Sequence, residues 1–271
     1  MAMITCAVPT LNSARTLEAT LLSLRSQFPS DVEVVVIDSG STDRTLDICR
    51  TLGVPVLLDE PDNMYRAINK GLSSADSEWL AYLNSDDWVY PGSYARLMEL
   101  GESTHADIVY GNCDYADASG RFIYPFLSAR PRQLRSLFRM GIMGIPQPTA
   151  IFRRSTFAQL GGFDATLHFV ADADFYSRAL DAGKMFAYCD RLPVSCFRVH
   201  REQLSFRRRS SMDEECRHLL ARREGKPGPM DWWAFLDWKF RNLPNYLIRI
   251  IRASYFSKRI RMPRSMDDYD E

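Results

Sequence analysis

Three polar runs follow short apolar runs in the first third of the chain, and they carry residue types that bind ligands. They are PTLN at residues 9–12, DSGSTD at 38–43 and NSDD at 84–87. Their carboxylate, amide and hydroxyl oxygens can bind hard cations or hydrogen-bond to polar small molecules. Asp38 and Asp43 also suit turns and helix caps, and for Asp43 alone that structural role is the favoured interpretation.

Asp86 and Asp87 form the most informative pair in these runs. Two adjacent carboxylates repel each other unless a cation or a hydrogen-bond donor offsets their charge. Magnesium or manganese takes few protein carboxylates and completes its shell with water and phosphate oxygens. The pair therefore predicts a site for a metal and a diphosphate, and a solvated acidic turn is the alternative.

The elements that must position these residues follow an alternating α/β pattern. Nearly continuous apolar runs predict buried parallel strands at Ile4–Val8, Val32–Ile37, Val54–Leu58 and Trp79–Leu83. Helical spacing predicts two crossover helices. The first follows a Ser13 cap and carries the apolar stripe Leu17, Leu21, Leu24 and Phe28, and the second carries the stripe Met64, Ala67, Ile68 and Leu72. Ligands bind at the carboxyl ends of parallel strands, so the polar runs are expected at one edge of the sheet.

The rest of the chain has two further compositions. From about Gly111 the pattern is irregular, and we expect a loop-rich region until a helix from about Asp172 to Ala182, which Gly183 ends. Near Gly225 a Gly-Lys-Pro-Gly-Pro linker introduces a segment rich in aromatic residues and arginine. The predicted organisation is therefore residues 1–110, residues 111–225 and a helical appendage at residues 226–271.

Composition restricts the class of protein. The chain has 271 residues and 46% hydrophobic content, enough for one large core or two merged cores. Its 34 basic and 34 acidic residues balance, so no overall charge would draw the whole molecule onto nucleic acid or a membrane, and any such attraction must be local. Six cysteines without a C-x-x-C pair argue against a zinc site and a disulfide framework. No signal-like start and no apolar run of bilayer length occur, so a cytoplasmic location is expected.

Five segments, in order and spacing, resemble the inverting family-two glycosyltransferases with the GT-A fold. They are ITCAVPTLNSARTLEATLLSLRSQ, VEVVVIDSGSTDRT, NKGLSSADSEWLAYLNSDD, GGFDATLHFVADADFYSR and FRVHREQLS, and they cover about residues 1–207. Each is weak alone, whereas five in the correct order are specific. The resemblance implies a Rossmann-like, mostly parallel central sheet flanked by helices. It also implies that residues 1–110 bind a nucleotide sugar and residues 111–225 bind the acceptor and carry out catalysis.

The resemblance assigns the first two polar runs, together with Ser85, to the nucleotide. Pro9, Thr10 and Asn12 are expected to line the nucleoside pocket, and Asp38 is expected to hold the base or the ribose.

Asn84-Ser85-Asp86 stands where the family carries its D-x-D motif, so the resemblance implies that Asp86 is a metal ligand. Asn84 replaces the first aspartate of that motif, which puts a two-carboxylate clamp from positions 84 and 86 in doubt. Asp87 is the residue expected to compensate as a second ligand.

In the second half, Asp172 falls where such enzymes keep their catalytic base. An inverting transfer needs one group that takes the proton of the acceptor hydroxyl, and a carboxylate is sufficient. The alternatives are that Asp174 is the base or that these carboxylates only cap a helix N-terminus.

His200 lies in an RVHR run, where related enzymes often have a histidine near the metal or the diphosphate. Metal ligation and a structural role remain as two alternatives for it. Arg198, Arg201 and Arg207 are candidates for pairing with the diphosphate, although solvated surface arginines are commoner.

The predicted function is metal-dependent, inverting transfer of a sugar from a nucleoside-diphosphate donor to a hydroxyl acceptor. The resemblance implies Mn²⁺ or Mg²⁺ as cofactor, UDP as the default nucleotide, and polysaccharide, lipopolysaccharide or glycolipid assembly as the setting. A nucleotidyltransferase or a dehydrogenase would need a glycine-rich loop after the first strand, and PTLN is not one. The alternative from another class is a sugar-nucleotide-binding or scaffold protein in which the Asn84 replacement has abolished activity.

The C-terminal segment predicts a further contact. From Arg241 to Arg264 the chain has seven basic residues and no acidic one. Apolar residues at helical spacing and a preceding aromatic group accompany them: Leu247, Ile250, Ile251 and Tyr255, after Trp232, Trp233, Phe235 and Trp238. This combination suits a helix in the headgroup region at the inner face of the membrane, close to a lipid-linked acceptor. Packing on the catalytic domain, or on a second copy as a homodimer, is the alternative.

Overall fold

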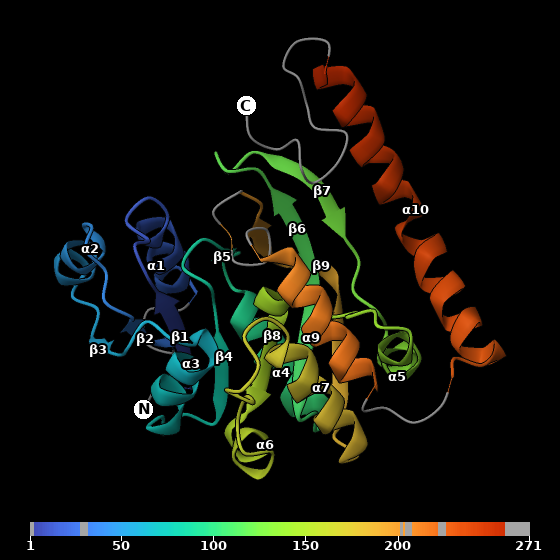
Figure 1. The fold of residues 1–271 in the computed structure, drawn as a ribbon, viewed down its shortest axis with the longest axis horizontal. Coiled ribbons are helices and arrows are strands. Elements are labelled where there is room, and N and C mark those ends of the chain that lie inside the picture. Colours follow the sequence, from blue (N-terminus) through green and yellow to red (C-terminus); the bar gives the residue numbers. More distant parts are fainter. Residues whose placement is uncertain (1–2, 28–31, 201–202, 204–207, 222–225, 258–271) are drawn as a thin grey trace.

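The computed structural model describes residues 3–27, 32–200, 203, 208–221 and 226–257. One nine-stranded sheet runs through both halves of the chain (Figure 1). The order of its strands is β3 (Val56–Leu58), β2 (Val32–Asp38), β1 (Ile4–Thr10), β4 (Trp79–Tyr82), β8 (Ala150–Arg153), β6 (Ile108–Ala116), β9 (Phe186–Arg198) and β5 (Trp88–Val89), with β7 (Phe122–Phe126) paired to β6.

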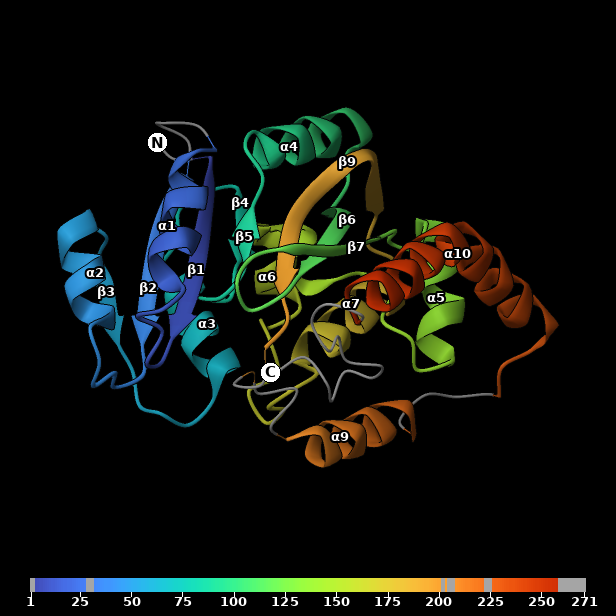
Figure 2. The ribbon, with the colours of Figure 1, turned by 90° about the horizontal axis from the view of Figure 1, so that it is seen from above.

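Helices cover both faces of this sheet, which confirms the predicted α/β class (Figures 1 and 2). One face carries α1 (Leu17–Arg25), α2 (Thr45–Leu52) and α4 (Ser93–Thr104). The other carries α3 (Met64–Ser73), α5 (Pro131–Arg139), α6 (Arg154–Gln159), α7 (Ala171–Asp181), α9 (Arg209–Ala221) and α10 (Pro229–Ser257). Within the described ranges, no helix combines the length and the apolar character needed to cross a membrane.

The four strands predicted in the first third form a parallel block of the sheet, with ends within two residues of expectation. β1 continues past its predicted end, because Pro9 and Thr10 still pair with Ile37 and Asp38 of β2. Pairing of β1 with β4 has already stopped at Ala7. The missing N–H of Pro9 is tolerated there, and Thr10 and Asp38 come to lie side by side.

The helix stripes are confirmed, and the Ser13 cap is wrong. Leu17, Leu21 and Leu24 are buried, whereas Phe28 lies outside the described residues. The cap position of α1 is Thr16, with no side-chain cap. The Ser13 hydroxyl instead contacts the third polar run, so tertiary contact replaced the local one.

The loop-rich region expected after Gly111 is also wrong. The sheet continues through β6, β7, β8 and β9, so it crosses the expected boundary between residues 110 and 111. β8, β7 and β5 pair antiparallel, and the long parallel pair of β6 and β9 has register shifts around Asn112. Because bulges and polar insertions interrupt these strands, their apolar runs are too short to recognise in the sequence.

The helix predicted ahead of Gly183 is confirmed within one residue, as α7. Gly183 has a φ of +71°, and its N–H donates to the carbonyl of Leu180 while the N–H of Lys184 donates to that of Ala179. This left-handed ending favours glycine.

Candidate functional site

Asp38 lies at the carboxyl end of β2 and is fully buried. Its Oδ1 accepts the N–H groups of Gly40 (3.1 Å) and Ser41 (2.9 Å), and its Oδ2 accepts the hydroxyls of Thr10 (3.2 Å) and Ser41. Gly40 has a φ of +89°, which favours glycine at this turn. Asp38 thus shapes the loop that follows β2 and fixes Thr10 beside it.

Asn12 joins the first polar run to the second. It has a φ of +51°, and its Oδ1 accepts the N–H of Thr42 at 2.8 Å while its own N–H donates to the Ser41 hydroxyl at 2.8 Å. Asp43 accepts the N–H of Thr45, the first residue of α2, at 2.9 Å, which is the structural role favoured for it. The two loops therefore form one rim.

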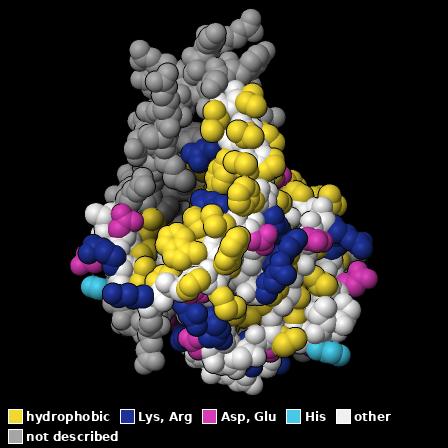
Figure 3. Space-filling model, turned by 90° about the vertical axis from the view of Figure 1, so that its right-hand side faces the viewer, with side chains coloured by type: hydrophobic (Ala, Val, Ile, Leu, Met, Phe, Trp, Pro, Cys, Tyr) yellow, Lys and Arg dark blue, Asp and Glu magenta, His cyan; other side chains and the backbone are white. Residues whose placement is uncertain are grey.

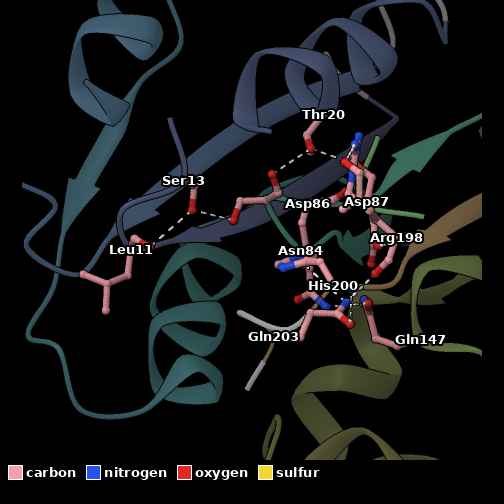
Figure 4. Close-up of polar contacts among 12 residues, drawn as sticks. Leu11, Ser13, Thr20, Asn84, Asp86, Asp87, Gln147, Arg198, His200 and Gln203 are labelled. Atoms are coloured by element: carbon pink, nitrogen blue, oxygen red, sulfur yellow. Dashed lines mark hydrogen bonds and ion pairs between the residues drawn. The ribbon is translucent and has the colours of Figure 1, made fainter. Parts of the chain in front are cut away.

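The third polar run is tied to the same rim by hydroxyl contacts (Figure 4). The Oγ atoms of Ser13 and Ser85 lie 2.7 Å apart. The Thr20 hydroxyl donates to the carbonyls of Ser85 (3.0 Å) and Asp87 (2.7 Å). The structure thus brings the three polar runs together at one edge of the sheet, as the parallel topology predicts.

Asp86 and His200 face each other across this edge (Figure 4). His200 Nε2 lies 2.8 Å from Asp86 Oδ2, and Gln203 Nε2 donates to the same oxygen at 3.4 Å. The Asp86 and His200 side chains are 18% and 19% exposed. A carboxylate and an imidazole that meet at a solvent-accessible point are a donor pair suited to a divalent cation.

Asp87 has a different environment from its neighbour. It is fully buried, and its Oδ1 accepts the N–H of Arg198 at 2.8 Å, whereas its Oδ2 has no hydrogen-bond partner. Burial and the adjacent Asp86 carboxylate raise the pKa of Asp87 well above its usual range. Arg198 Nε in turn donates to the Asp86 carbonyl at 2.8 Å, so it holds the acidic loop in place. Arg201 and Arg207 lie outside the described residues.

The donor set around Asp86 fits a divalent cation that shares its shell with a ligand. Asn84 Oδ1 is buried and has no partner, while its Nδ2 donates to Gln147 Oε1 at 3.2 Å. Over the part of the chain that the structure describes, no three His, Cys, Asp or Glu side chains converge as a complete metal site. A cation beside Asp86 and His200 would therefore take its other ligands from phosphate oxygens and water.

Asp172 occupies the first turn of α7 and is 5% exposed. Its Oδ1 accepts the N–H of Ala173 at 2.8 Å and the hydroxyl of Tyr65 at 3.3 Å. Burial raises the pKa of Asp172 to about 6, although both donors favour the ionised form. Asp174 is instead bound to Arg178 at 2.6 Å. The geometry therefore separates the two carboxylates: Asp174 forms an ion pair within its helix, and Asp172 does not.

Two other helices hold the turn that precedes Asp172. On α9, Glu215 accepts the N–H groups of His168 and Phe169 through its two oxygens, both at 2.8 Å. On α3, the Tyr65 hydroxyl also reaches the Phe169 carbonyl at 3.2 Å. α3 and α9 therefore set where α7 begins and where the Asp172 carboxylate lies.

Sequence reasoning missed Tyr65, Gln147, Gln203 and Glu215. Tyr65 lies beside an apolar helical stripe, and Gln147 lies between two prolines in the region expected to be loop-rich. Glu215 belongs to an acidic helix with no local signal of its contact 46 or 47 residues away. No local pattern distinguishes these residues, because tertiary contacts alone define their roles.

Comparisons with known proteins fit this arrangement. The family model described as "Glycosyl transferase family 2" matches residues 5–161. A PGL/p-HBAD biosynthesis glycosyltransferase of Mycobacterium bovis (strain BCG / Pasteur 1173P2) is 32% identical over 184 residues, which cover 65% of this chain and 69% of the relative. The succinoglycan biosynthesis protein ExoO of Rhizobium meliloti (strain 1021) is 32% identical over 138 residues, 49% of this chain and 40% of that protein.

Solved structures share the fold at low sequence identity. S. aureus TarS 1-349 in complex with UDP-GlcNAc superposes with a TM-score of 0.63 and 18% identity, over 90% of this chain and 73% of TarS 1-349. The mannosyltransferase PcManGT from Pyrobaculum calidifontis, in complex with GDP-Man and Mn²⁺, superposes with a TM-score of 0.63 and 19% identity, over 94% of this chain and 74% of PcManGT. In two other TarS structures the alignment spans 61% and 43% of that chain. These likenesses establish the GT-A architecture of the sheet and helices.

Proposed function

Since the chain belongs to glycosyl transferase family 2, we propose that it transfers a sugar from a nucleoside-diphosphate donor to a hydroxyl acceptor, with metal dependence and inversion at the anomeric carbon. One observation carries this proposal: Asp86 and His200 meet at 2.8 Å at the sheet edge where the three polar runs converge. The mycobacterial relative is named a glycosyltransferase, which supports the same reaction class.

The donor pocket is proposed to use the rim built by the first two polar runs. Pro9, Thr10 and Asn12 would line the nucleoside, Asp38 would hold the base or ribose, and Ser85 would complete the wall. The TarS complexes contain UDP and UDP-GlcNAc, and PcManGT contains GDP-Man. UDP is the first nucleotide to test and GDP is the second.

Asp86 and His200 are proposed to hold Mn²⁺ or Mg²⁺, as their donor atoms permit. A bound cation would offset the charge that develops on the departing diphosphate. Asp87 is proposed to fix the backbone of Arg198 behind them, and its Oδ2, which has no hydrogen-bond partner, is the atom to be tested as a further ligand.

Asp172 is proposed to act as the catalytic base. Its carboxylate, ionised above a pKa of about 6, accepts the proton of the acceptor hydroxyl while that oxygen forms a bond to the anomeric carbon. The bond from that carbon to the diphosphate breaks on the opposite side, so the configuration inverts and the nucleoside diphosphate leaves. Tyr65 and the N–H of Ala173 hold the carboxylate during the step, and Asp172 then passes its proton to solvent.

The acceptor is proposed to be a lipid-linked or polysaccharide hydroxyl, bound by residues 111–225. Relatives named for PGL/p-HBAD and for succinoglycan biosynthesis support glycolipid or polysaccharide assembly. A membrane-associated acceptor would place the protein at the inner face of the cell membrane. Contact through residues 226–271, with a membrane or with a second copy, is developed below.

A thermal-shift experiment with UDP and GDP sugars, each with and without Mn²⁺, tests the proposal. Ligands that bind only the folded state raise its apparent stability, so the wild type is expected to show a larger shift with Mn²⁺. Asp86→Asn should lose the Mn²⁺-dependent part of the shift. Asp47→Asn, at a 56% exposed side chain on α2, is the matched control and should keep it. An undiminished Mn²⁺ effect in Asp86→Asn would refute the metal assignment.

Release of nucleoside diphosphate from the identified donor then separates an enzyme from a binding protein. Slow hydrolysis that requires Mn²⁺, with the released sugar first appearing as the opposite anomer by NMR, is the expected result. Donor binding without release, in the presence of either metal and a panel of acceptors, would favour the sugar-nucleotide-binding or scaffold alternative.

A further inference from the structure

The outward face of α10 is largely apolar. Between Pro229 and Ile251, the residues that the structure exposes most are all hydrophobic residues or proline. These residues are Pro229, Met230, Trp232, Trp233, Leu236, Phe240, Leu243, Pro244, Leu247, Ile248, Ile250 and Ile251. At 1.5 Å per residue they form a stripe about 30 Å long, which is far more than the isolated apolar side chains of an ordinary surface.

The inward face of the same helix carries its polar anchors. Asn242 is 1% exposed, and its side chain binds both the N–H (2.9 Å) and the carbonyl (3.0 Å) of Leu127. Asp231 is 4% exposed, accepts the N–H of Gly228 at 2.9 Å at the start of the helix, and lies 3.5 Å from Arg139 of α5. Trp238 is 4% exposed and packs on Phe126. Packing on the catalytic domain therefore accounts for Trp238 and these polar anchors, and it leaves the apolar stripe uncovered.

Figure 3 shows this stripe as a continuous apolar band along α10, with basic side chains and some acidic ones beside it. α10 packs against α5 and β7. On the α5 side, the Arg132 side chain is 71% exposed and lies 3.7 Å from Asp237, whose side chain is 46% exposed. Along α10 itself, Lys239 and Arg241 lie between the stripe and the packed face. The border of the band is thus mostly basic, with Asp237 as an acidic residue in it.

We propose that the outward face of α10 lies in the headgroup region of a membrane that contains anionic lipid. A helix with a largely apolar face and mostly basic flanks binds such an interface, because burial of apolar area adds to attraction by the lipid charge. Trp232 and Trp233, 53% and 73% exposed, are residues that favour this boundary. This inference deepens the acceptor part of the proposed function and rests on it for its biological meaning.

Charge favours a membrane over a second copy of the chain. A two-fold contact would place the stripe and its border against themselves. Among the described residues beside the stripe, the basic side chains of Arg132, Lys239, Arg241 and Arg249 outnumber the acidic one of Asp237, so such a contact would bring like charges together. An anionic surface complements the same border.

The position of α10 also suits a lipid-linked acceptor. α10 packs on β7, β7 pairs with β6, and β6 pairs with β9, whose last residue is Arg198 beside Asp86. The membrane face therefore flanks the half of the sheet that is proposed to bind the acceptor, not the donor rim at β1 and β2.

Co-sedimentation of the full chain with vesicles tests the proposal. The vesicles contain phosphatidylcholine with or without about 30% phosphatidylglycerol, at about 0.05 M and 0.5 M NaCl. The wild type is expected to bind the anionic vesicles and to bind them more weakly at high salt. The variant Trp233→Ser/Phe240→Ser/Ile251→Ser, at side chains 73%, 69% and 64% exposed, should bind at least tenfold more weakly and keep its folded stability.

Met185→Ser/Leu192→Ser is the matched control, because these apolar side chains are 58% and 56% exposed away from α10. It should bind vesicles as the wild type does. Negligible binding by the wild type would overturn the proposal, and so would a lipid-free dimer that the triple variant abolishes. Release of nucleoside diphosphate is measured separately without vesicles, in the presence of the panel of acceptors: its absence would refute the proposed function, while vesicle binding that the triple variant loses would still support the membrane contact.

Discussion

Replacing Tyr65 with phenylalanine should move the acid limb of the pH–rate profile to higher pH. The Tyr65 hydroxyl donates to Asp172 Oδ1 at 3.3 Å and favours the ionised carboxylate. Without this donor the carboxylate holds its proton more tightly. A base must be ionised to accept a proton, so activity should then require a higher pH.

The size of this change follows from the geometry. A hydrogen bond to a charged group contributes about 1.5–3 kcal/mol, and the lower end applies here because the contact is long and the hydroxyl also reaches the Phe169 carbonyl at 3.2 Å. About 1.4 kcal/mol corresponds to one pH unit. With a wild-type pKa of about 6 for Asp172, the variant should be about fivefold slower at pH 6 and nearly unchanged above about pH 8.5.

The assay is kcat/KM for donor turnover from about pH 5 to pH 9. Tyr94→Phe is the matched control, since Tyr94 is equally buried at 2% exposure and its hydroxyl lies 3.5 Å from Cys6 Sγ, on the opposite face of the sheet. Its acid limb should stay in place. The reasoning fails if the limb of Tyr65→Phe does not move, or if the rate falls by the same factor at every pH.

Three further outcomes test the site. Asp172→Asn should lower kcat by about a hundredfold or more. Because the pKa of Asp172 is raised from 3.8 to about 6 in the folded state, its ionisation destabilises the fold as pH rises through that window, by about 3 kcal/mol at neutral pH. The variant has no such ionisation and should therefore unfold no more easily than wild type at pH 7.5. A larger turnover loss in Asp174→Asn would transfer the base role to Asp174. Glu215→Ala should lower kcat about tenfold and leave the donor affinity, measured by isothermal titration, unchanged. The kcat of Glu215→Gln, which keeps one acceptor oxygen, should lie between that of Glu215→Ala and that of the wild type. Weakened donor binding in either variant would contradict a positioning role. Asp87→Asn should keep the Mn²⁺-dependent thermal shift, since the asparagine Oδ1 can still accept the N–H of Arg198, and loss of that shift would make Asp87 a metal ligand.

Local patterns in the sequence were sufficient for the parallel half of the fold and for the rim of polar runs. Buried parallel strands have continuous apolar runs, and such runs end where the backbone reaches the sheet edge, so Asp38 and Asp86 could be placed from the sequence. The strands of the second half could not be placed, because β6 and β9 owe their pairing to partners far along the chain and contain register shifts.

The site residues divide in the same way. The sequence by itself determined that Asp86 and Asp172 were candidates. Only the tertiary structure decided that Asp86 meets His200, 114 residues away, that Asp87 is buried, and that Asp172 has Tyr65, 107 residues away, as its donor. A carboxylate's protonation and ligands depend on burial and on the groups that surround it, and long-range packing sets both.

The orientation of the C-terminal helix α10 is a further feature that the sequence did not determine. Its apolar and basic residues were visible in the sequence, yet helical spacing does not say which face of a helix is covered. The structure decided this through Asn242, Asp231 and Trp238, which dock the helix by one face. Buried polar groups must find partners, so the side that carries Asn242 and Asp231 turned inward to the Leu127 backbone and to Arg139 of α5, and the apolar stripe was left facing outward.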